Sequence, residues 1–204
     1  MTTDNPQGLT PPGVWTREYV RTELWANVYG EPLPLDKNPE PGSVEPIRCV
    51  LAEYLSPACA SVLDVGCGWV WYHVPDHVTY TGVDISPPML ELARALHPRH
   101  EFIEASSFDL PFATGQYEGV RSSGMLRHIE AWEPALDEMM RVANKRMAFT
   151  HLVSDAPGKD GPYQWSVRTE AVLDRLPASA DVTVETHKEK EGHEYECARF
   201  MVEL

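Results

Sequence analysis

Residues 62–68 read Val-Leu-Asp-Val-Gly-Cys-Gly, and Gly82-Val83-Asp84 closes a second run twenty positions after Asp64. The first stretch predicts a buried β-strand that ends in a glycine turn, and the second predicts a strand that ends in a carboxylate. Glycine lets the backbone turn tightly and lets a ligand approach without meeting a Cβ atom. A carboxylate at the tip of the second strand can accept hydrogen bonds from two ribose hydroxyls. Together the two stretches predict the nucleotide-binding half of a doubly wound α/β sheet.

The rest of the chain supplies the other elements of such a sheet. The apolar runs and the helical spacings predict strands at 61–65, 78–83, 102–103, 119–123 and 146–151 and helices at 86–96, 131–143 and 169–176. Ser86 and Thr169 are the expected N-caps of the first and last of these helices. A glycine-containing loop is expected after the fifth strand, and alternating residues at 181–187 and 195–203 predict a closing antiparallel hairpin. We therefore expect an α/β, Rossmann-like, doubly wound sheet of about seven strands with helices on both faces.

Three parts of the chain differ in composition. Residues 1–13 are polar and rich in proline, which predicts a disordered tail without the apolar core of a signal peptide. Residues 14–58 hold two segments with helical spacing, expected to form N-terminal helices that could act as a lid. Residues 59–204 carry the predicted sheet domain. Since no apolar run is long enough to span a bilayer, we expect no contact with a membrane.

Charge and cysteine content exclude several function classes. The 204 residues include 31 acidic and 17 basic ones, for a formal net charge of -14, and such a surface does not favour nucleic acid. The four cysteines form no Cys-x-x-Cys pair, so neither a zinc site nor a disulfide framework is expected, and free thiols fit a cytoplasmic protein. His73 and His77 have metal-ligand spacing, but Pro75 between them breaks the helix they would need, so no metal site is predicted.

Residues 60–152 resemble the class I S-adenosylmethionine-dependent methyltransferases. The resemblance rests on the strand–glycine turn–strand–acid pattern, on Leu110-Pro111-Phe112, on residues 116–129 around the fourth strand and on the following helix at 136–142. The chain departs from the family at Val70, where the third glycine of the first loop is expected, at Ser106, where an acid often faces adenine, and at 144–146, where Pro-Gly-Gly is usual. These departures concern details of cofactor contact and leave the strand–loop–strand frame intact.

The resemblance implies S-adenosyl-L-methionine as cofactor and a set of contacts for each part of it. Asp64 would orient the ammonium group, Asp84 would hold the ribose hydroxyls, and Ser123 would line the methionine end. The remaining implied contacts are Gly66, Cys67 and Gly68 beside the methionine part, Ile85 and Met89 on the faces of adenine, and Ser106, Ser107 and Phe108 at its edge.

Methyl transfer from a sulfonium needs mainly positioning and exclusion of water, and a base only where the acceptor must lose a proton. His128, after the fourth strand, and His151, in the fifth, are the candidate bases. The candidate acceptor contacts are the aromatic residues Trp15, Tyr19, Tyr72 and Tyr163. Aromatic residues at the mouth of the site favour a planar or apolar small molecule.

Two other functions are compatible with the same half-fold. A non-catalytic protein that binds S-adenosylmethionine or S-adenosylhomocysteine would keep the pocket without the chemistry. A nicotinamide-dependent oxidoreductase would normally show Gly-x-Gly-x-x-Gly opening a long helix, whereas Trp71 stands at the last of those positions here. The sequence indicates neither the acceptor, nor the methylated atom, nor the oligomeric state.

Overall fold

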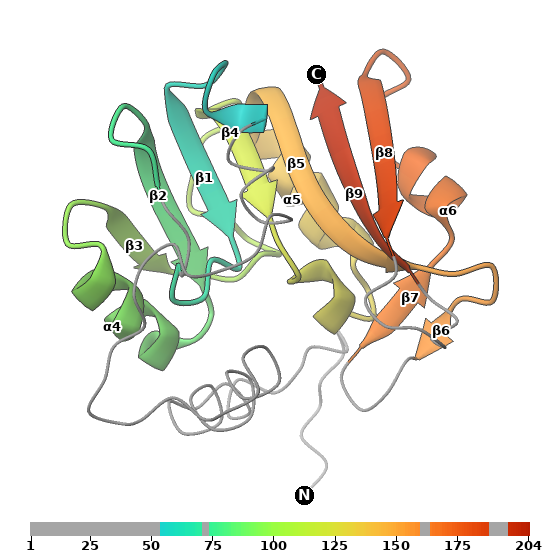
Figure 1. Cartoon of the computed structure of the whole chain (residues 1–204), viewed down its shortest axis with the longest axis horizontal. Coiled ribbons are helices and arrows are strands. Elements are labelled where there is room, and N and C mark those ends of the chain that lie inside the picture. Colours follow the sequence, from blue (N-terminus) through green and yellow to red (C-terminus); the bar gives the residue numbers. More distant parts are fainter. Residues whose placement is uncertain (1–53, 71–73, 160–163, 188–195) are drawn as a thin grey trace, which may run out of the picture.

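The structure, a computed structural model, describes residues 54–70, 74–159, 164–187 and 196–204. In this part of the chain one mixed sheet forms the centre of the molecule (Figure 1). Its strands are β1 (Ser61–Val65), β2 (Thr79–Asp84), β3 (Glu101–Glu104), β4 (Tyr117–Ser122), β5 (Ala143–Val153), β6 (Gly158–Lys159), β7 (Trp165–Val167), β8 (Asp181–His187) and β9 (Glu196–Glu203). The helices around the sheet are α4 (Pro87–Leu96), α5 (Glu133–Val142), α6 (Thr169–Leu173) and the short 3-10 helix η3 (Leu126–His128).

The parallel half of the sheet has the order β3-β2-β1-β4-β5, and β9 continues it antiparallel to β5, with β8 antiparallel to β9. Seven strands thus form the predicted Rossmann-like sheet with its closing hairpin, and the fold class is confirmed. The strand order reverses direction between β1 and β4. The carboxyl ends beside that reversal form the edge where ligands bind in open α/β sheets.

The two crossover helices lie on opposite faces of the sheet. The connection through α4 leads from β2 to β3, toward one edge of the sheet, and the connection through α5 leads from β4 to β5, in the opposite direction. Because such crossovers are right-handed, connections that run in opposite directions place their helices on opposite faces. The packing agrees, because Tyr80 of β2 joins the apolar cluster of α4 whereas Val83 joins the larger cluster of α5. Alternate side chains of each inner strand are therefore buried on both faces, which explains the near-continuous apolar runs in the sequence.

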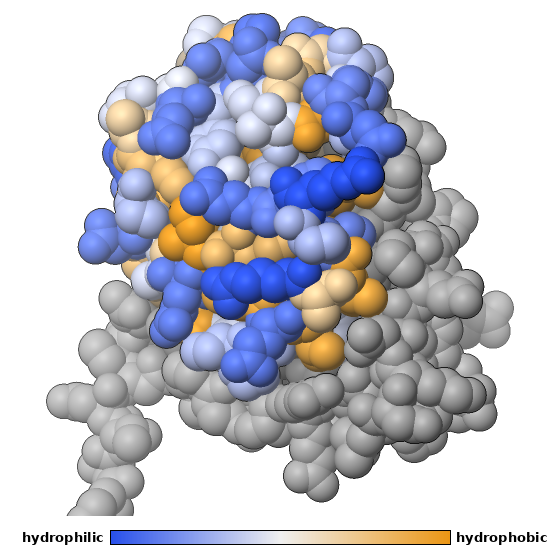
Figure 2. All heavy atoms as spheres, turned by 90° about the vertical axis from the view of Figure 1, so that its left-hand side faces the viewer, coloured by the Kyte–Doolittle hydropathy of each residue, from blue (hydrophilic) through white to orange (hydrophobic). Residues whose placement is uncertain are grey.

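The edge strand β3 is protected by charge. Glu101 and Glu104 are exposed on it, and Arg94 of α4 donates a hydrogen bond from Nη2 to the carbonyl of Phe102 at 2.8 Å. Figure 2 faces this side of the molecule and shows hydrophilic side chains in rows across an apolar background. Charged residues along an exposed edge discourage pairing with another chain.

Two expectations about local structure are wrong. The expected loop after β5 contains the short antiparallel pair β6 and β7. β7 pairs in parallel with β5 at Leu152 and Val153, and β9 pairs with the other edge of these two residues. β7 therefore lies on the same edge of β5 as β4, beyond the point where β4 ends at Ser122. Strands of two and three residues have no alternating run by which the sequence could reveal them.

The second error concerns a helix cap. Arg168, with an extended backbone, is the N-cap of α6, and Thr169 is already the first helical residue. Ser86 is the N-cap of α4 as expected, but no cap hydrogen bond is formed by its side chain. Its backbone N–H instead donates to Asp84 Oδ1 at 2.9 Å, so the start of α4 is held by the acid that precedes it.

Candidate functional site

The glycine turn after β1 has the geometry that its sequence predicts. Gly66 and Gly68 have φ values of 71° and 56°, in the left-handed region that favours glycine. The backbone N–H groups of Gly66 and Cys67 both donate to the carbonyl of Val83, at 2.8 and 2.9 Å, so the turn is fastened to the end of β2. A Cβ atom added at Gly66 would lie 2.6 Å from Met125, whereas one added at Gly68 would meet no atom of the described residues within 4 Å. The turn therefore packs against the loop after β4 at its first glycine, and no described residue occupies the space beside its second.

Asp84 joins the glycine turn to the neighbouring loops. Its Oδ2 accepts a hydrogen bond from the N–H of Gly68 at 2.8 Å, and its carbonyl accepts one from the N–H of Ala105 at 3.2 Å. Burial raises the pKa of the Asp84 carboxyl above its ordinary value, although the hydrogen bonds from the Ser86 and Gly68 amides partly offset this. Asp84 thus stands where the turn after β1, the start of α4 and the loop after β3 meet.

Cys67 and Met89 take part in this region mainly through packing. The Cys67 side chain is buried, with its sulfur against Gly82, and burial raises the pKa of its thiol well above the ordinary range. Met89 lies in the buried cluster of α4, whereas Ile85 is 36% exposed beside Asp84. Of the two apolar residues expected on the faces of adenine, only Ile85 presents its side chain at the surface.

The loop after β3, expected at the edge of adenine, is held in a defined turn. Ser106 Oγ accepts a hydrogen bond from the N–H of Phe108 at 3.2 Å, and the carbonyl of Ser106 accepts one from Asp109 at 3.2 Å. Ser107 is half-buried, and Phe108 packs against the large apolar cluster. The loop therefore offers backbone groups and the Ser107 side chain, while the Ser106 hydroxyl serves the turn.

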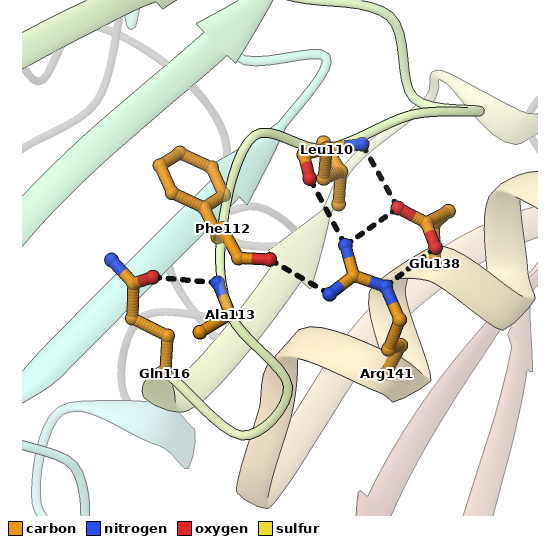
Figure 3. A network of polar contacts seen from close by, with 6 residues as sticks. All are labelled: Leu110, Phe112, Ala113, Gln116, Glu138 and Arg141. Carbon is orange, nitrogen blue, oxygen red and sulfur yellow. Dashed lines mark hydrogen bonds and ion pairs between the residues drawn. The ribbon is translucent and has the colours of Figure 1, made fainter.

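A clamp on α5 fixes the next part of the same loop (Figure 3). Arg141 donates to the carbonyls of Phe112 and Leu110 at 2.7 and 3.0 Å and forms a two-point ion pair with Glu138 at 2.6 and 2.7 Å. Glu138 also accepts a hydrogen bond from the N–H of Leu110 at 2.9 Å. The planar guanidinium can serve all these acceptors at once because its donors form a rigid fork. Leu110-Pro111-Phe112 is thus tied to α5 by both partners of one ion pair.

The loop after β4 approaches the glycine turn from the other side. Met125 covers Gly66, and the N–H of Gly124 donates to Thr150 Oγ1 of β5 at 2.8 Å. Ser123, expected at the methionine end, is half-buried in this loop. Ser123 lies directly after β4, one residue before the Gly124 bond to β5 and two residues before the Met125 contact with Gly66.

The two candidate bases differ strongly in environment. His128 is half-buried on η3, whereas His151 is buried in β5, where its ring meets Trp132 edge-on with centroids 5.6 Å apart. Burial, together with the positive charge of Arg127 and His128, lowers the pKa of His151 to about 3. Its Nδ1 lies 3.1 Å from the carbonyl of Leu152, and its buried Nε2 has no hydrogen-bond partner in the described part of the chain.

A buried polar cluster beneath the turn includes two residues that sequence reasoning missed. Asp64 Oδ2 accepts a hydrogen bond from the Tyr80 hydroxyl at 2.7 Å and lies 3.5 Å from Arg121 Nε, and the Asp64 and Arg121 side chains are each 2% exposed. Burial and the adjacent Asp64 raise the pKa of Tyr80 well above its usual range. The signal available was Arg121 inside a predicted central strand, since a buried cation needs a carboxylate partner.

The candidate acceptor contacts Trp15, Tyr19, Tyr72 and Tyr163 lie outside the described residues, as does most of the expected lid at 14–58. Among the residues that the structure does describe, no three His, Cys, Asp or Glu side chains gather as a metal site would require. No described helix is long and apolar enough to cross a bilayer.

Comparison with known proteins agrees with this architecture. Residues 63–148 match the family model described as a methyltransferase domain. An O-methyltransferase from Aspergillus nomiae NRRL is 31% identical over 107 residues, which cover 47% of this chain and 48% of that protein. The chain thus spans about half the length of this curated relative.

Two solved structures extend the likeness to the rest of the fold. The cyclase SpnF has a TM-score of 0.65 at 16% identity, with 90% of this chain and 93% of that chain covered. The 1,6-didemethyltoxoflavin N1-methyltransferase of Burkholderia thailandensis, solved with 1,6-didemethyltoxoflavin and S-adenosylhomocysteine bound, has a TM-score of 0.56 at 18% identity over 77% of this chain and 76% of that one. Residues 63–148 thus match a methyltransferase domain, and the resemblance seen in the sequence to the class I S-adenosylmethionine-dependent methyltransferases extends to the fold of a solved methyltransferase.

Proposed function

We propose that the protein is an S-adenosylmethionine-dependent methyltransferase that acts on a small-molecule acceptor. The observation that carries the proposal is the junction at Asp84. There the Asp84 carboxylate accepts a hydrogen bond from the Gly68 N–H, next to space that no described residue fills. A ribose bound there would reach the Asp84 carboxylate, because no side chain at Gly68 stands in the way. The residues present therefore fit an adenosyl cofactor.

Each part of the junction has a task in the proposed reaction. S-adenosylmethionine supplies, when bound, a methyl group already activated by its sulfonium. Asp84 would bind the ribose, Ile85 would cover one face of the adenine, and the loop at 105–109 would meet the adenine edge. The glycine turn and Ser123 would line the methionine end. The protein's contribution is then to align donor and acceptor and to exclude water.

Of the two histidines, we assign the role of base to His128, for acceptors that must lose a proton. His128 is accessible in part at the end of β4, where an acceptor would meet the methyl group. With a pKa of about 3, His151 is a poor proton acceptor at neutral pH. We propose that the buried ring of His151 has a packing role next to η3 and takes no part in proton transfer.

The small-molecule acceptor is supported by the relatives. One is an O-methyltransferase, and one methylates a nitrogen of a small heterocycle according to its name. A net charge of -14 does not favour nucleic acid as an acceptor. We also propose a cytoplasmic location, in line with the buried free thiols of Cys59, Cys67 and Cys197.

One observation favours a second candidate function. SpnF shares the fold over 90% of this chain and is a cyclase, so the fold alone does not establish methyl transfer. The second candidate is a protein that binds the cofactor without transferring its methyl group. Binding and turnover must therefore be measured separately.

The test is calorimetric titration of the full chain with S-adenosylhomocysteine, with NADH as the competing ligand class. We expect micromolar binding of S-adenosylhomocysteine and none of NADH. Asp84→Asn should weaken binding about 30-fold, since hydrogen bonds to a charged group contribute about 1.5–3 kcal/mol. Glu101→Gln, which makes the same charge change at the exposed start of β3, is the matched control. Preference for NADH, or equal affinity of the Asp84→Asn variant and the wild type, would contradict the proposal.

Turnover then separates the two candidates. Protein that binds S-adenosylhomocysteine is incubated with S-adenosylmethionine labelled in its methyl group and a panel of small phenols, carboxylates and nitrogen heterocycles. Label in an acceptor supports methyl transfer. Binding without label in any acceptor favours the non-catalytic candidate.

A further inference from the structure

Val70 keeps a backbone shape that normally requires glycine. It stands at the position of the third glycine of the first loop, and its φ of 50° makes it the one described non-glycine residue in the left-handed region. A β-branched side chain is strained there, because Cβ crowds the backbone. Val70 is also fully buried, in one apolar cluster with Trp69, Leu90 and Ala93. Burial of the side chain and strain in the backbone thus act in opposite directions at this residue.

A side chain from α4 contacts this strained residue. His97, the C-cap of α4, places Nε2 2.5 Å from the carbonyl oxygen of Val70, across 27 positions of sequence. Since a carbonyl can only accept, Nε2 carries the proton and donates. The bond orients the carbonyl that follows the strained φ angle and so opposes its relaxation.

Backbone hydrogen bonds of adjacent residues link Val70 to the junction of Gly68 and Asp84. The Val70 N–H donates to the carbonyl of Cys67 at 3.2 Å, and the adjacent Gly68 N–H is the donor to Asp84 Oδ2. A change of φ at Val70 rotates the peptide group before it, which carries the N–H of the Cys67 bond. The turn can therefore keep its shape only while Val70 stays in the left-handed region.

We propose that His97 is a positioning residue, which holds Val70 in the left-handed conformation and thereby keeps the Gly68 amide and Asp84 arranged for an adenosyl ligand. This inference rests on the proposed function for the identity of the ligand. It assigns to the end of α4 a role in cofactor affinity, although His97 has no place among the expected contacts. Without the bond, only a fraction of the molecules would hold the competent turn, and the apparent affinity would fall to that fraction of its intrinsic value.

The experiment uses two substitutions of matched length in the full chain. His97→Gln keeps an N–H donor at the end of the side chain, and His97→Met does not. We expect His97→Met to weaken S-adenosylhomocysteine binding about tenfold and His97→Gln to stay near the wild type. His77→Met, at an exposed histidine bonded to Ser56 instead, is the control and should bind as the wild type does.

Rescue by glycine distinguishes positioning from simple packing. Glycine enters the left-handed region without strain, so Val70→Gly combined with His97→Met should recover most of the lost affinity. A His97→Met variant that unfolds but is restored by Val70→Gly gives the same answer. Equal binding by His97→Met and the wild type, or a double variant as weak as the single one, would overturn the proposal.

A second readout needs no ligand. Hydrogen exchange of the Gly68 amide in the free protein should be faster in His97→Met and return to the wild-type rate in the double variant. If the wild type fails to bind S-adenosylhomocysteine, the proposed function falls while this readout still decides whether His97 holds the turn. Unchanged exchange at Gly68 would overturn the positioning role by itself.

Discussion

At the scale of single residues, the least expected feature is the buried group of Asp64, Tyr80 and Arg121. Asp64 is expected to orient the ammonium group of the cofactor, yet its Oδ2 accepts from Tyr80 and pairs with Arg121 inside the sheet. A buried ion pair contributes little net stability, but loss of one partner leaves a charge in a low-dielectric interior. We therefore interpret Arg121 as the partner that makes an ionised Asp64 tolerable at this depth.

Arg121→Met tests this interpretation. Met fills a similar volume without charge, so the variant isolates the loss of the cation. We expect a decrease of about 3 kcal/mol in the free energy of unfolding, measured by urea denaturation, because the Asp64 carboxylate loses its counter-charge. The double variant with Asp64→Asn should recover a clear part of that loss. If the two substitutions destabilise additively, the pair does not interact in the way inferred.

His151 gives a prediction about pH. Its pKa is about 3 in the folded protein, below the ordinary 6.5, so the ring stays neutral when folded and takes up a proton when unfolded. The stability that this difference contributes is present above about pH 6.5 and is lost as the pH falls from there toward 3. Between pH 7.5 and 5.5 the loss should be on the order of 1 kcal/mol.

The measurement is urea denaturation at both pH values for the wild type and His151→Phe. Phe fills a similar space beside Trp132 and cannot titrate, so the variant should lose less stability on acidification than the wild type. His77→Phe, at an exposed position, should keep the wild-type difference. A His151→Phe variant with the full wild-type pH dependence would show that His151 titrates normally in the folded protein.

At the scale of secondary-structure elements, the site depends on how α5 holds the loop that leads into β4. Glu138 and Arg141, one turn apart on α5, bind three backbone groups of Leu110 and Phe112 (Figure 3). The same loop begins at Ala105, whose N–H donates a hydrogen bond to the carbonyl of Asp84. Hydrogen bonds from α5 therefore support the loop at the adenine edge of the candidate site.

Arg141→Lys tests this support while the charge is kept. A lysine ammonium cannot reproduce the planar fork, so we expect the two bonds to the carbonyls of Leu110 and Phe112 to weaken. The unfolding free energy should fall by about 1–2 kcal/mol, and S-adenosylhomocysteine affinity should fall with it. Arg175→Lys, at an exposed ion pair with Asp137, is the matched control and should change neither quantity clearly. Wild-type affinity in Arg141→Lys would show that the clamp does not support the binding loop.

The long elements could be predicted from the sequence because each is specified locally. The sequence predicts the first strand at 61–65, its observed span, and the other parallel strands lie within a few residues of expectation. The strands β6 and β7 could not be predicted, since the pairing that forms them comes from β5 and not from their own residues. The start of α6 was misplaced by one residue because threonine is a frequent cap, whereas Arg168 caps it only by its backbone.

At the scale of the whole molecule, the sequence predicts which segments lie together better than it predicts the interactions between them. The glycine turn, Asp84, the loop after β3 and the loop after β4 meet at one edge of the sheet, as the strand order requires. The bonds from His97 to Val70 and from Arg121 to Asp64 could not be predicted, because each joins residues whose proximity only the folded chain creates. The acceptor contacts Trp15, Tyr19, Tyr72 and Tyr163 stay predictions.

The proposed function requires that an adenosyl ligand binds where Gly68 and Asp84 meet. The most direct test is an NMR titration of nitrogen-15-labelled protein with S-adenosylhomocysteine. We expect the largest amide shifts at Gly66, Gly68, Ile85 and Ser107, with little change in the hairpin of β8 and β9. Saturable binding whose shifts centre on that hairpin, or no shifts at any ligand concentration, would contradict it.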